Sequence, residues 1–189
     1  MAYCGKHTFS LIILLIAAIF AVAATSQCAI LPAICLAEEG SGAENFEEMA
    51  SYTTSFASSG TGRVNNIRLA AAALNGYTVQ PGQELSFNAA VGERTTERGY
   101  SVAKVIVDGE YVEGVGGGVC QVSSTLYNAW VLAGLDVVRV QGHSLPSGYV
   151  PMSQDATVSE YIDLVLKNDT AFPVQVRTKT DGTDLNIAV

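Results

Sequence analysis

Residues 114–134 read GVGGGVCQVSSTLYNAWVLAG, a run of glycines that passes directly into a helical pattern. From about Gln121 onward, apolar residues recur at helical spacing, and Gly134 supplies a left-handed stop. This order predicts that Cys120 lies at or beside the start of a helix. Free N–H groups and the positive end of the helix dipole at that place favour a thiolate over a thiol.

A thiolate there is a candidate nucleophile for acyl transfer, and the chain offers few partners for it. Besides Cys120, the cysteines all lie within the first 37 residues: Cys4, Cys28 and Cys35. The chain has two histidines, and His143 is the one outside that segment. His143 is therefore the candidate general base, and Asp155 is the candidate carboxylate that orients it. Asp136 and Asp163 are weaker candidates because they lie in strand-like patterns.

The residues around Cys120 are candidates for holding the oxyanion and for lining a cleft: Gly116, Gly117, Gly118, Gln121 and Ser123. A purely structural role stays open for these residues, since glycine loops often serve close packing and a lone cysteine is often an inert buried residue. The loop matches neither phosphate-binding pattern. A zinc site from Cys120, His143 and Asp155 lacks a local pair of ligands, so we expect no metal and no cofactor.

The N-terminal part has the features of an export segment. The chain has 189 residues and a mass of 19.8 kDa, and after Lys6 residues 11–24 carry no polar side chain. Residues 1–37 are therefore expected to be a signal peptide or an uncleaved membrane anchor, which makes the protein extracytoplasmic. Residues 38–62, rich in acids and then in Ser and Gly, are expected to be a flexible linker. The formal net charge of −8 provides no basic footprint for nucleic acid.

Residues 63–189 are expected to form one α+β domain with about two helices and a mixed, mostly antiparallel sheet of about seven strands. Asn65 or Asn66 is expected to cap the first helix. Leu85–Ala89 is expected to be a short strand. Val102–Val107 is expected to form a hairpin that turns at residues 108–109.

The same residues carry a family resemblance over roughly 63–189. The motifs, in chain order, are Asn66-Ile67, Leu74-Asn75-Gly76, Ser86-Phe87-Asn88, Gly116-Gly117-Gly118-Val119-Cys120-Gln121-Val122-Ser123, His143-Ser144, Tyr149-Val150-Pro151 and Asp155-Ala156-Thr157-Val158. Together they resemble the VanW-like family. The resemblance implies a bacterial cell-envelope protein, exported or membrane-anchored, that acts near peptidoglycan and is associated with vancomycin resistance. It implies no particular reaction, although Cys120, Gln121, His143 and Asp155 belong to the family's pattern.

Two functions follow as expectations. In the first, the chain is a thiol hydrolase or transpeptidase-like enzyme in which Cys120 attacks a cell-wall peptide; the order Cys, His, Asp is similar to that of thiol hydrolases of the transglutaminase type. In the second, it is a non-catalytic module that binds peptidoglycan or another envelope component, and its acidic charge favours neutral or cationic ligands. A structural spacer is a third alternative. The expected partners are a cell-wall peptide or glycan, and the membrane if the N-terminal segment is retained.

Overall fold

The computed structural model describes residues 46–107 and 109–189. The expected export segment, residues 1–37, lies outside these residues. Among the helices of the described part, none combines the length and the apolar character that a membrane-spanning helix requires.

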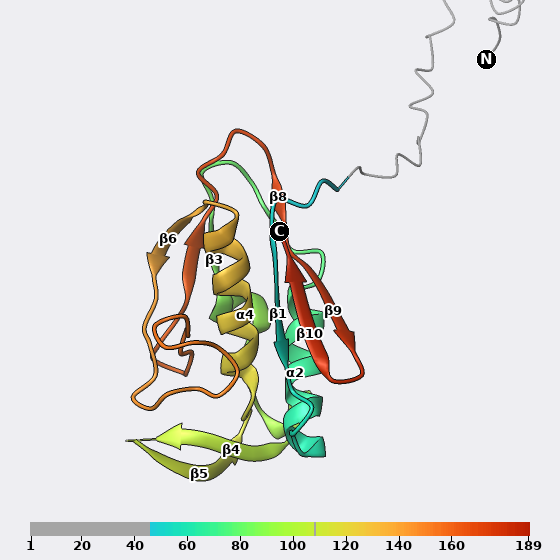
Figure 1. Cartoon of the computed structure of the whole chain (residues 1–189), viewed down its shortest axis with the longest axis vertical. Coiled ribbons are helices and arrows are strands. Elements are labelled where there is room, and N and C mark those ends of the chain that lie inside the picture. The colour runs from blue at the N-terminus through green and yellow to red at the C-terminus, as the bar shows by residue number, and fades with distance from the viewer. Residues whose placement is uncertain (1–45, 108) are drawn as a thin grey trace, which may run out of the picture. The chain divides into compact units, whose positions relative to one another are not determined.

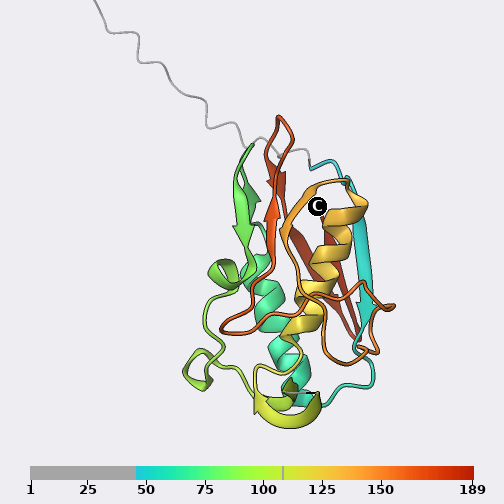
Figure 2. The same ribbon diagram turned by 90° about the vertical axis from the view of Figure 1, so that its left-hand side faces the viewer.

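Two long helices form the centre of the domain: α2 (Thr61–Leu74) and α4 (Val119–Leu132). They pack against each other, as the two views together show (Figures 1 and 2). Leu74, Leu126 and Trp130 are completely buried between the helices and the strands around them. Burying side chains of this size contributes about 1.5–3 kcal/mol each, so this packing is a main source of stability.

The strands surround α4 in small sheets whose pairs are all antiparallel. One sheet has the order β1 (Ser51–Ser55), β10 (Asp184–Ala188), β9 (Arg177–Asp181). A second has the order β3 (Glu84–Ser86), β7 (Val165–Lys167), β6 (Asp136–Arg139), and β2 (Thr78–Val79) pairs with β8 (Val174–Gln175). Helix α4 packs against β1 and β10 on one side and β6 on another, which confirms the α+β class.

The expected hairpin is present as β4 (Val102–Val107) and β5 (Glu110–Val115). Its register pairs Val102 with Val115 and brings the end of β5 back to the root of β4. The hairpin lies at the bottom of Figure 1, where β5 leads through the glycine loop into α4.

The expected linker is partly ordered structure, which corrects its boundary at residue 62. Residues 51–55 form β1, which pairs along its whole length with β10 near the C-terminus. Phe56 follows it and is 2% exposed in the core. A composition rich in Ser, Thr and Gly is typical of linkers, but here the backbone hydrogen bonds come from a strand that is remote in sequence.

Two further local expectations are wrong. Helix α2 begins at Thr61, and Asn66 lies buried inside it instead of capping it. The Asn66 amide accepts from the Ser101 N–H at 2.7 Å and donates to the Gly117 carbonyl at 2.9 Å, so it joins α2 to the glycine loop. Of the expected strand Leu85–Ala89, residues 85 and 86 lie in β3, but the rest belongs to the short helix α3 (Phe87–Val91), because the Ser86 hydroxyl caps it by accepting from the Ala89 N–H.

Candidate active site

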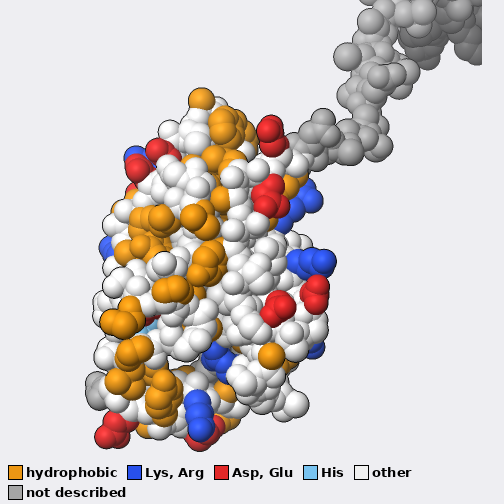
Figure 3. All heavy atoms as spheres, in the orientation of Figure 1, with side chains coloured by type: hydrophobic (Ala, Val, Ile, Leu, Met, Phe, Trp, Pro, Cys, Tyr) orange, Lys and Arg blue, Asp and Glu red, His pale blue; other side chains and the backbone are white. Residues whose placement is uncertain are grey.

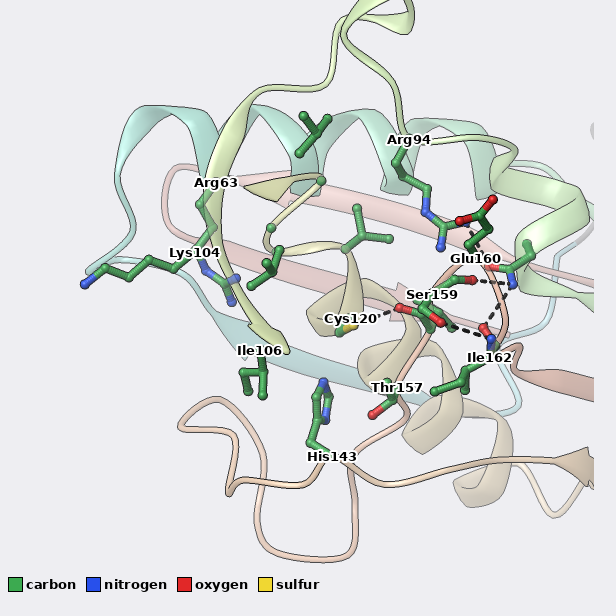
Figure 4. Close-up of a pocket in the computed structure, with 18 of the residues that line it drawn as sticks. Arg63, Arg94, Lys104, Ile106, Cys120, His143, Thr157, Ser159, Glu160 and Ile162 are labelled. Atoms are coloured by element: carbon green, nitrogen blue, oxygen red, sulfur yellow. Dashed lines mark hydrogen bonds between the residues drawn. The ribbon is translucent and has the colours of Figure 1, made fainter. Parts of the chain in front are cut away.

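A cavity of about 1420 Å³ opens at the N-terminal end of α4. The hairpin β4–β5 forms one wall, and the long loop between β6 and β7 forms the opposite wall (Figure 4). In the space-filling view, apolar side chains gather along the left of the molecule, over β6 and down to the hairpin (Figure 3). The residues that line the cavity include Arg63, Lys104, Tyr111, Cys120, His143 and Tyr149.

Cys120 is the second residue of α4 and lines this cavity, half-buried. Its Sγ donates a hydrogen bond to the Val158 carbonyl at 3.4 Å. The sulfur is thus neither sealed within the apolar core nor freely exposed. The first turn of a helix beneath it is the arrangement that the sequence predicts.

The glycines before Cys120 are required by close backbone approach. A Cβ at Gly117 would lie 2.5 Å from the Lys104 carbonyl oxygen of β4. Gly118 has a φ of +106°, a left-handed conformation that L side chains rarely adopt. These two positions allow the chain to turn from the hairpin into α4 and to present Cys120 at the cavity.

His143 and Asp155 meet in the loop between β6 and β7. The Asp155 Oδ2 atom lies 2.6 Å from His143 Nδ1 and also accepts from the His143 backbone N–H at 2.5 Å. Their side chains are only 7% and 12% exposed. Because a carboxylate only accepts, Nδ1 carries a proton, and Nε2 is the ring nitrogen left for Cys120. Figure 4 shows the imidazole pointing toward Cys120.

The electrostatics couple these three groups. Burial alone would lower the pKa of His143, but its interactions with Cys120, and then those with Asp155, outweigh it, so the pKa of His143 is raised. Burial would raise the pKa of Asp155, but the hydrogen bonds from His143 outweigh it, so the pKa of Asp155 is lowered. The structure therefore brings Cys120 and His143 to the same cavity and joins Asp155 to the His143 ring.

Gln121 and Ser123 do not line the cavity, which corrects the expectation for both. Gln121 is 1% exposed, and its Nε2 donates to the Thr54 hydroxyl and the Ser55 carbonyl, both at 3.0 Å. The Ser123 hydroxyl is fully buried and donates to the Ala156 carbonyl at 2.6 Å. Both side chains fix α4 to the rest of the fold.

Of the three glycines expected to hold an oxyanion, Gly116 has its N–H occupied by the Ser101 carbonyl at 3.2 Å. The N–H groups of Val119 and Gln121 likewise donate to the carbonyls of the loop. For the N–H groups of Gly117, Gly118 and Cys120, in contrast, no acceptor is found among residues 46–107 and 109–189.

Three residues outside the predicted site set also face this cavity: Arg63, Tyr149 and Thr157. The Arg63 guanidinium carbon lies 5.6 Å from the centroid of the Tyr149 ring, which in turn makes an edge contact with the His143 ring. Burial, the largest cause, raises the pKa of Tyr149, so its hydroxyl stays protonated at neutral pH. The Thr157 Oγ1 atom is buried and has no hydrogen-bond partner among the described residues.

Residues 46–107 and 109–189 contain no group of three or more His, Cys, Asp or Glu side chains that is arranged to hold an ion. The imidazole nitrogen that faces away from Cys120 is already occupied by Asp155.

Comparisons with known proteins agree with the motifs that line the cavity. The model of the family described as VanW like protein matches residues 62–189. The chain is 43% identical to an uncharacterized protein, YoaR, of Bacillus subtilis strain 168, over 76% of this chain and 48% of the relative. It is 32% identical to the vancomycin B-type resistance protein VanW of Enterococcus faecalis strain V583, over 63% of this chain and 46% of the relative.

The chain thus spans about half the length of these two relatives. No solved structure gives a significant match. The family model covers the glycine loop, Cys120, His143 and Asp155 together, and it extends over more than half of the sequence. The chain therefore belongs to the VanW-like family.

Proposed function

We propose that the chain is an extracytoplasmic enzyme that cleaves or transfers acyl groups of cell-wall peptides through a covalent Cys120 intermediate. The observation that carries the proposal is that a buried Asp155–His143 pair directs its free ring nitrogen toward Cys120 across one cavity. Acyl transfer requires a nucleophile next to a base, and a further group that orients the base.

In the proposed reaction, the Cys120 thiol gives its proton to His143 Nε2, and its sulfur attacks the carbonyl carbon of an amide. The hydrogen bond from Sγ to the Val158 carbonyl breaks at this step. When the tetrahedral intermediate collapses, the C–N bond breaks and His143 returns the proton to the leaving amine. Water or a second amine then gives a proton to His143 and attacks the thioester carbon; the C–S bond breaks, and His143 returns the proton to the Cys120 sulfur, which completes hydrolysis or transpeptidation.

The oxyanion of that intermediate accepts from the Cys120 N–H, at the first turn of α4. This N–H has no acceptor among residues 46–107 and 109–189, and it lies at the positive end of the helix dipole. It replaces Gly116 and Gln121, whose donors are occupied. In this proposal Gly117 and Gly118 serve the turn into α4, and Asp155 holds the tautomer of His143.

The choice of substrate rests on the family. One relative is described as a vancomycin B-type resistance protein, and the resemblance to that family implies proximity to peptidoglycan. The apolar N-terminal run, residues 11–24, supports export to the cell envelope, where that polymer lies. The proposed substrate class is therefore a cell-wall peptide.

The proposal is tested with the full chain and purified peptidoglycan. Released peptides or new cross-links are measured by mass spectrometry for the wild type, Cys120→Ala and His143→Gln. We expect product from the wild type, none above background from Cys120→Ala, and a rate lower by about 10²–10⁴-fold for His143→Gln. In parallel, iodoacetamide is expected to alkylate Cys120 in the native chain, as read from peptide masses after digestion.

Two outcomes would overturn the proposal. If Cys120 is alkylated only after denaturation, the thiol is inaccessible and cannot act as a nucleophile. If peptidoglycan binds equally well to the wild type and Cys120→Ala and yields no product from either, the chain is a binding module instead.

A further inference from the structure

Arg63, in the first turns of α2, brings a guanidinium to the wall of the same cavity. Its side chain is half-buried, and neutral groups hold it in place. Its Nε donates to the Ser59 hydroxyl at 3.1 Å, and its Nη2 donates to Gln121 Oε1 at 2.6 Å. Because Gln121 is itself fixed by Thr54, the guanidinium has one defined position.

The guanidinium of Arg63 is partly removed from water, and no carboxylate of the described residues forms an ion pair with it. The ion pairs within the described part of the chain are His143–Asp155 and Lys179–Asp181, and neither includes Arg63. Burial is the largest cause acting on the pKa of Arg63 and lowers it, while Tyr149 and Cys120 act in the opposite direction. An arginine nevertheless keeps its charge at any physiological pH, so Arg63 places a positive charge on the cavity wall that no carboxylate of the described residues pairs with.

The Nη1 atom of Arg63 is the end that remains available. It donates to no acceptor among residues 46–107 and 109–189. It lies close to the start of α4, because a Cβ at Gly118 would be 3.2 Å from it. Gly118 thus leaves room for the guanidinium two residues before Cys120, and Figure 4 shows Arg63 pointing into the cavity on the same side as Cys120.

We propose that Arg63 forms a carboxylate-binding subsite, which holds a free carboxylate of the substrate beside the carbonyl that Cys120 attacks. This inference rests on the proposed function and specifies its substrate: a peptide with an α-carboxylate or an acidic side chain next to the bond that is broken. A guanidinium binds a carboxylate through charge-assisted hydrogen bonds, which are stronger than neutral ones. The acidic net charge of the chain favours neutral or cationic ligands. The positive charge of Arg63 at the cavity instead favours an anionic group.

Two alkylating reagents of nearly equal size separate this subsite from the reactivity of the thiol. Iodoacetate and iodoacetamide transfer a two-carbon group to the sulfur with loss of iodide, and they differ in carrying a carboxylate or a neutral amide. If Arg63 binds the carboxylate, Arg63→Gln slows the alkylation of Cys120 by iodoacetate about tenfold and leaves the rate with iodoacetamide within about twofold. Arg63→Lys is expected to recover part of the loss, because it keeps the charge without the planar fork.

The matched control is Arg68→Gln, which removes the same charge from an exposed position on the same helix. It is expected to leave both rates unchanged. If Arg63→Gln slows both reagents equally, Arg63 acts on the thiol itself and the subsite is refuted, while the proposed function stands. If neither reagent modifies Cys120 in the native wild type, the proposed function fails and the subsite fails with it.

A second measurement needs no variant at Arg63. In the wild type, N-acetylalanine and N-acetylisoglutamine, which carry an α- and a γ-carboxylate respectively, are tested for protection of Cys120 from iodoacetamide. N-acetylalaninamide is the neutral control, and inorganic phosphate tests a different anion. Protection by either carboxylate over the amide supports the subsite and identifies the kind of carboxylate. Equal protection by the carboxylates and the amide, or protection by phosphate alone, would overturn it.

Discussion

Asp155 and Asp163 use the same arrangement of hydrogen bonds in two regions of one loop. Asp155 accepts from the backbone N–H and the ring of His143, at 2.5 and 2.6 Å. Asp163 accepts from the Ser86 hydroxyl at 2.5 Å and from the Asn88 N–H at 2.9 Å. Each carboxylate therefore ties one backbone N–H and one side chain to the loop between β6 and β7.

The two differ in what they hold. The group that Asp163 holds is Ser86, whose hydroxyl caps the short helix α3 and does not titrate. The group that Asp155 holds is an imidazole whose free nitrogen faces Cys120 across a cavity. The number and length of hydrogen bonds thus do not distinguish a structural carboxylate from a functional one. What distinguishes them is whether the side chain that the carboxylate binds can itself titrate.

The strongest test of this comparison replaces each carboxylate by its amide. Asp155→Asn is expected to slow the reaction of Cys120 with iodoacetamide at pH 7 by about 10–100-fold, because His143 loses the partner that fixes its tautomer and stabilises its cation. Asp163→Asn is expected to leave that rate within about twofold and to lower the free energy of unfolding by about 1–3 kcal/mol, because partly buried donors lose a carboxylate acceptor.

Urea unfolding and alkylation rates measured on both variants check these values together. A rate loss of equal size in the two variants would mean that both act through the rigidity of the loop. The comparison would then fail.

A smaller effect is expected in the titration of His143. Removing the thiol in Cys120→Ala is expected to lower the pKa of His143, since burial lowers it and Cys120 provides the largest opposing contribution. Proton NMR of the imidazole follows this pKa, and because His7 lies outside the described residues, the His143 resonance is assigned with His143→Gln. An unchanged pKa in Cys120→Ala would show that the thiol and the ring do not interact.

The same shift predicts the sign of a stability change with pH. Because the folded chain raises the pKa of His143, its stabilisation is complete below the unfolded value of about 6.5 and is lost as the pH rises through the folded pKa. For Asp155, whose pKa is lowered, stabilisation is present above about pH 3.9 and is lost as the pH falls through the folded pKa. Urea unfolding over a pH series of the wild type and His143→Gln measures the first of these two effects.

Cys120 and His143 could be singled out from the sequence because of their rarity, whereas Asp155 had to be selected from several aspartates. One cysteine and one histidine lie beyond residue 37, and the glycine pattern predicts the helix that begins beneath Cys120. Gln121 and Ser123 were misplaced because neighbours on a helix point in different directions, so residues adjacent to a cavity-facing cysteine turn into the core.

Other features depend on contacts between distant segments, which local patterns do not contain. The Ser/Thr-rich strand β1 owes its order to its pairing with β10 at the other end of the chain. Arg63 gives no local signal of a site either, because its place at the cavity is set by the packing of α2 on α4 and by its hydrogen bond to Gln121. The fold class can be predicted from the order of helices and strands along the sequence. The charge of the cavity cannot, because it depends on how distant segments pack.

The smallest effect is expected at Thr157. Comparing it with Thr54 distinguishes a polar group that is available to a ligand from one that stabilises the fold. The Thr157 Oγ1 is buried without a partner at the cavity, whereas the Thr54 hydroxyl contacts Thr125 Oγ1 at 2.8 Å and Gln121 Nε2 at 3.0 Å. Thr157→Val, nearly equal in shape, is expected to raise the free energy of unfolding by up to about 1 kcal/mol, because an unsatisfied hydroxyl is removed. Thr54→Val is the matched control and is expected to destabilise by about 1–3 kcal/mol, because each of two buried partners loses one hydrogen bond. Urea unfolding measures both. A loss of stability in Thr157→Val would show that its hydroxyl already has a partner in the folded chain, whereas unchanged or raised stability with weaker binding of peptidoglycan would assign that hydroxyl to the ligand.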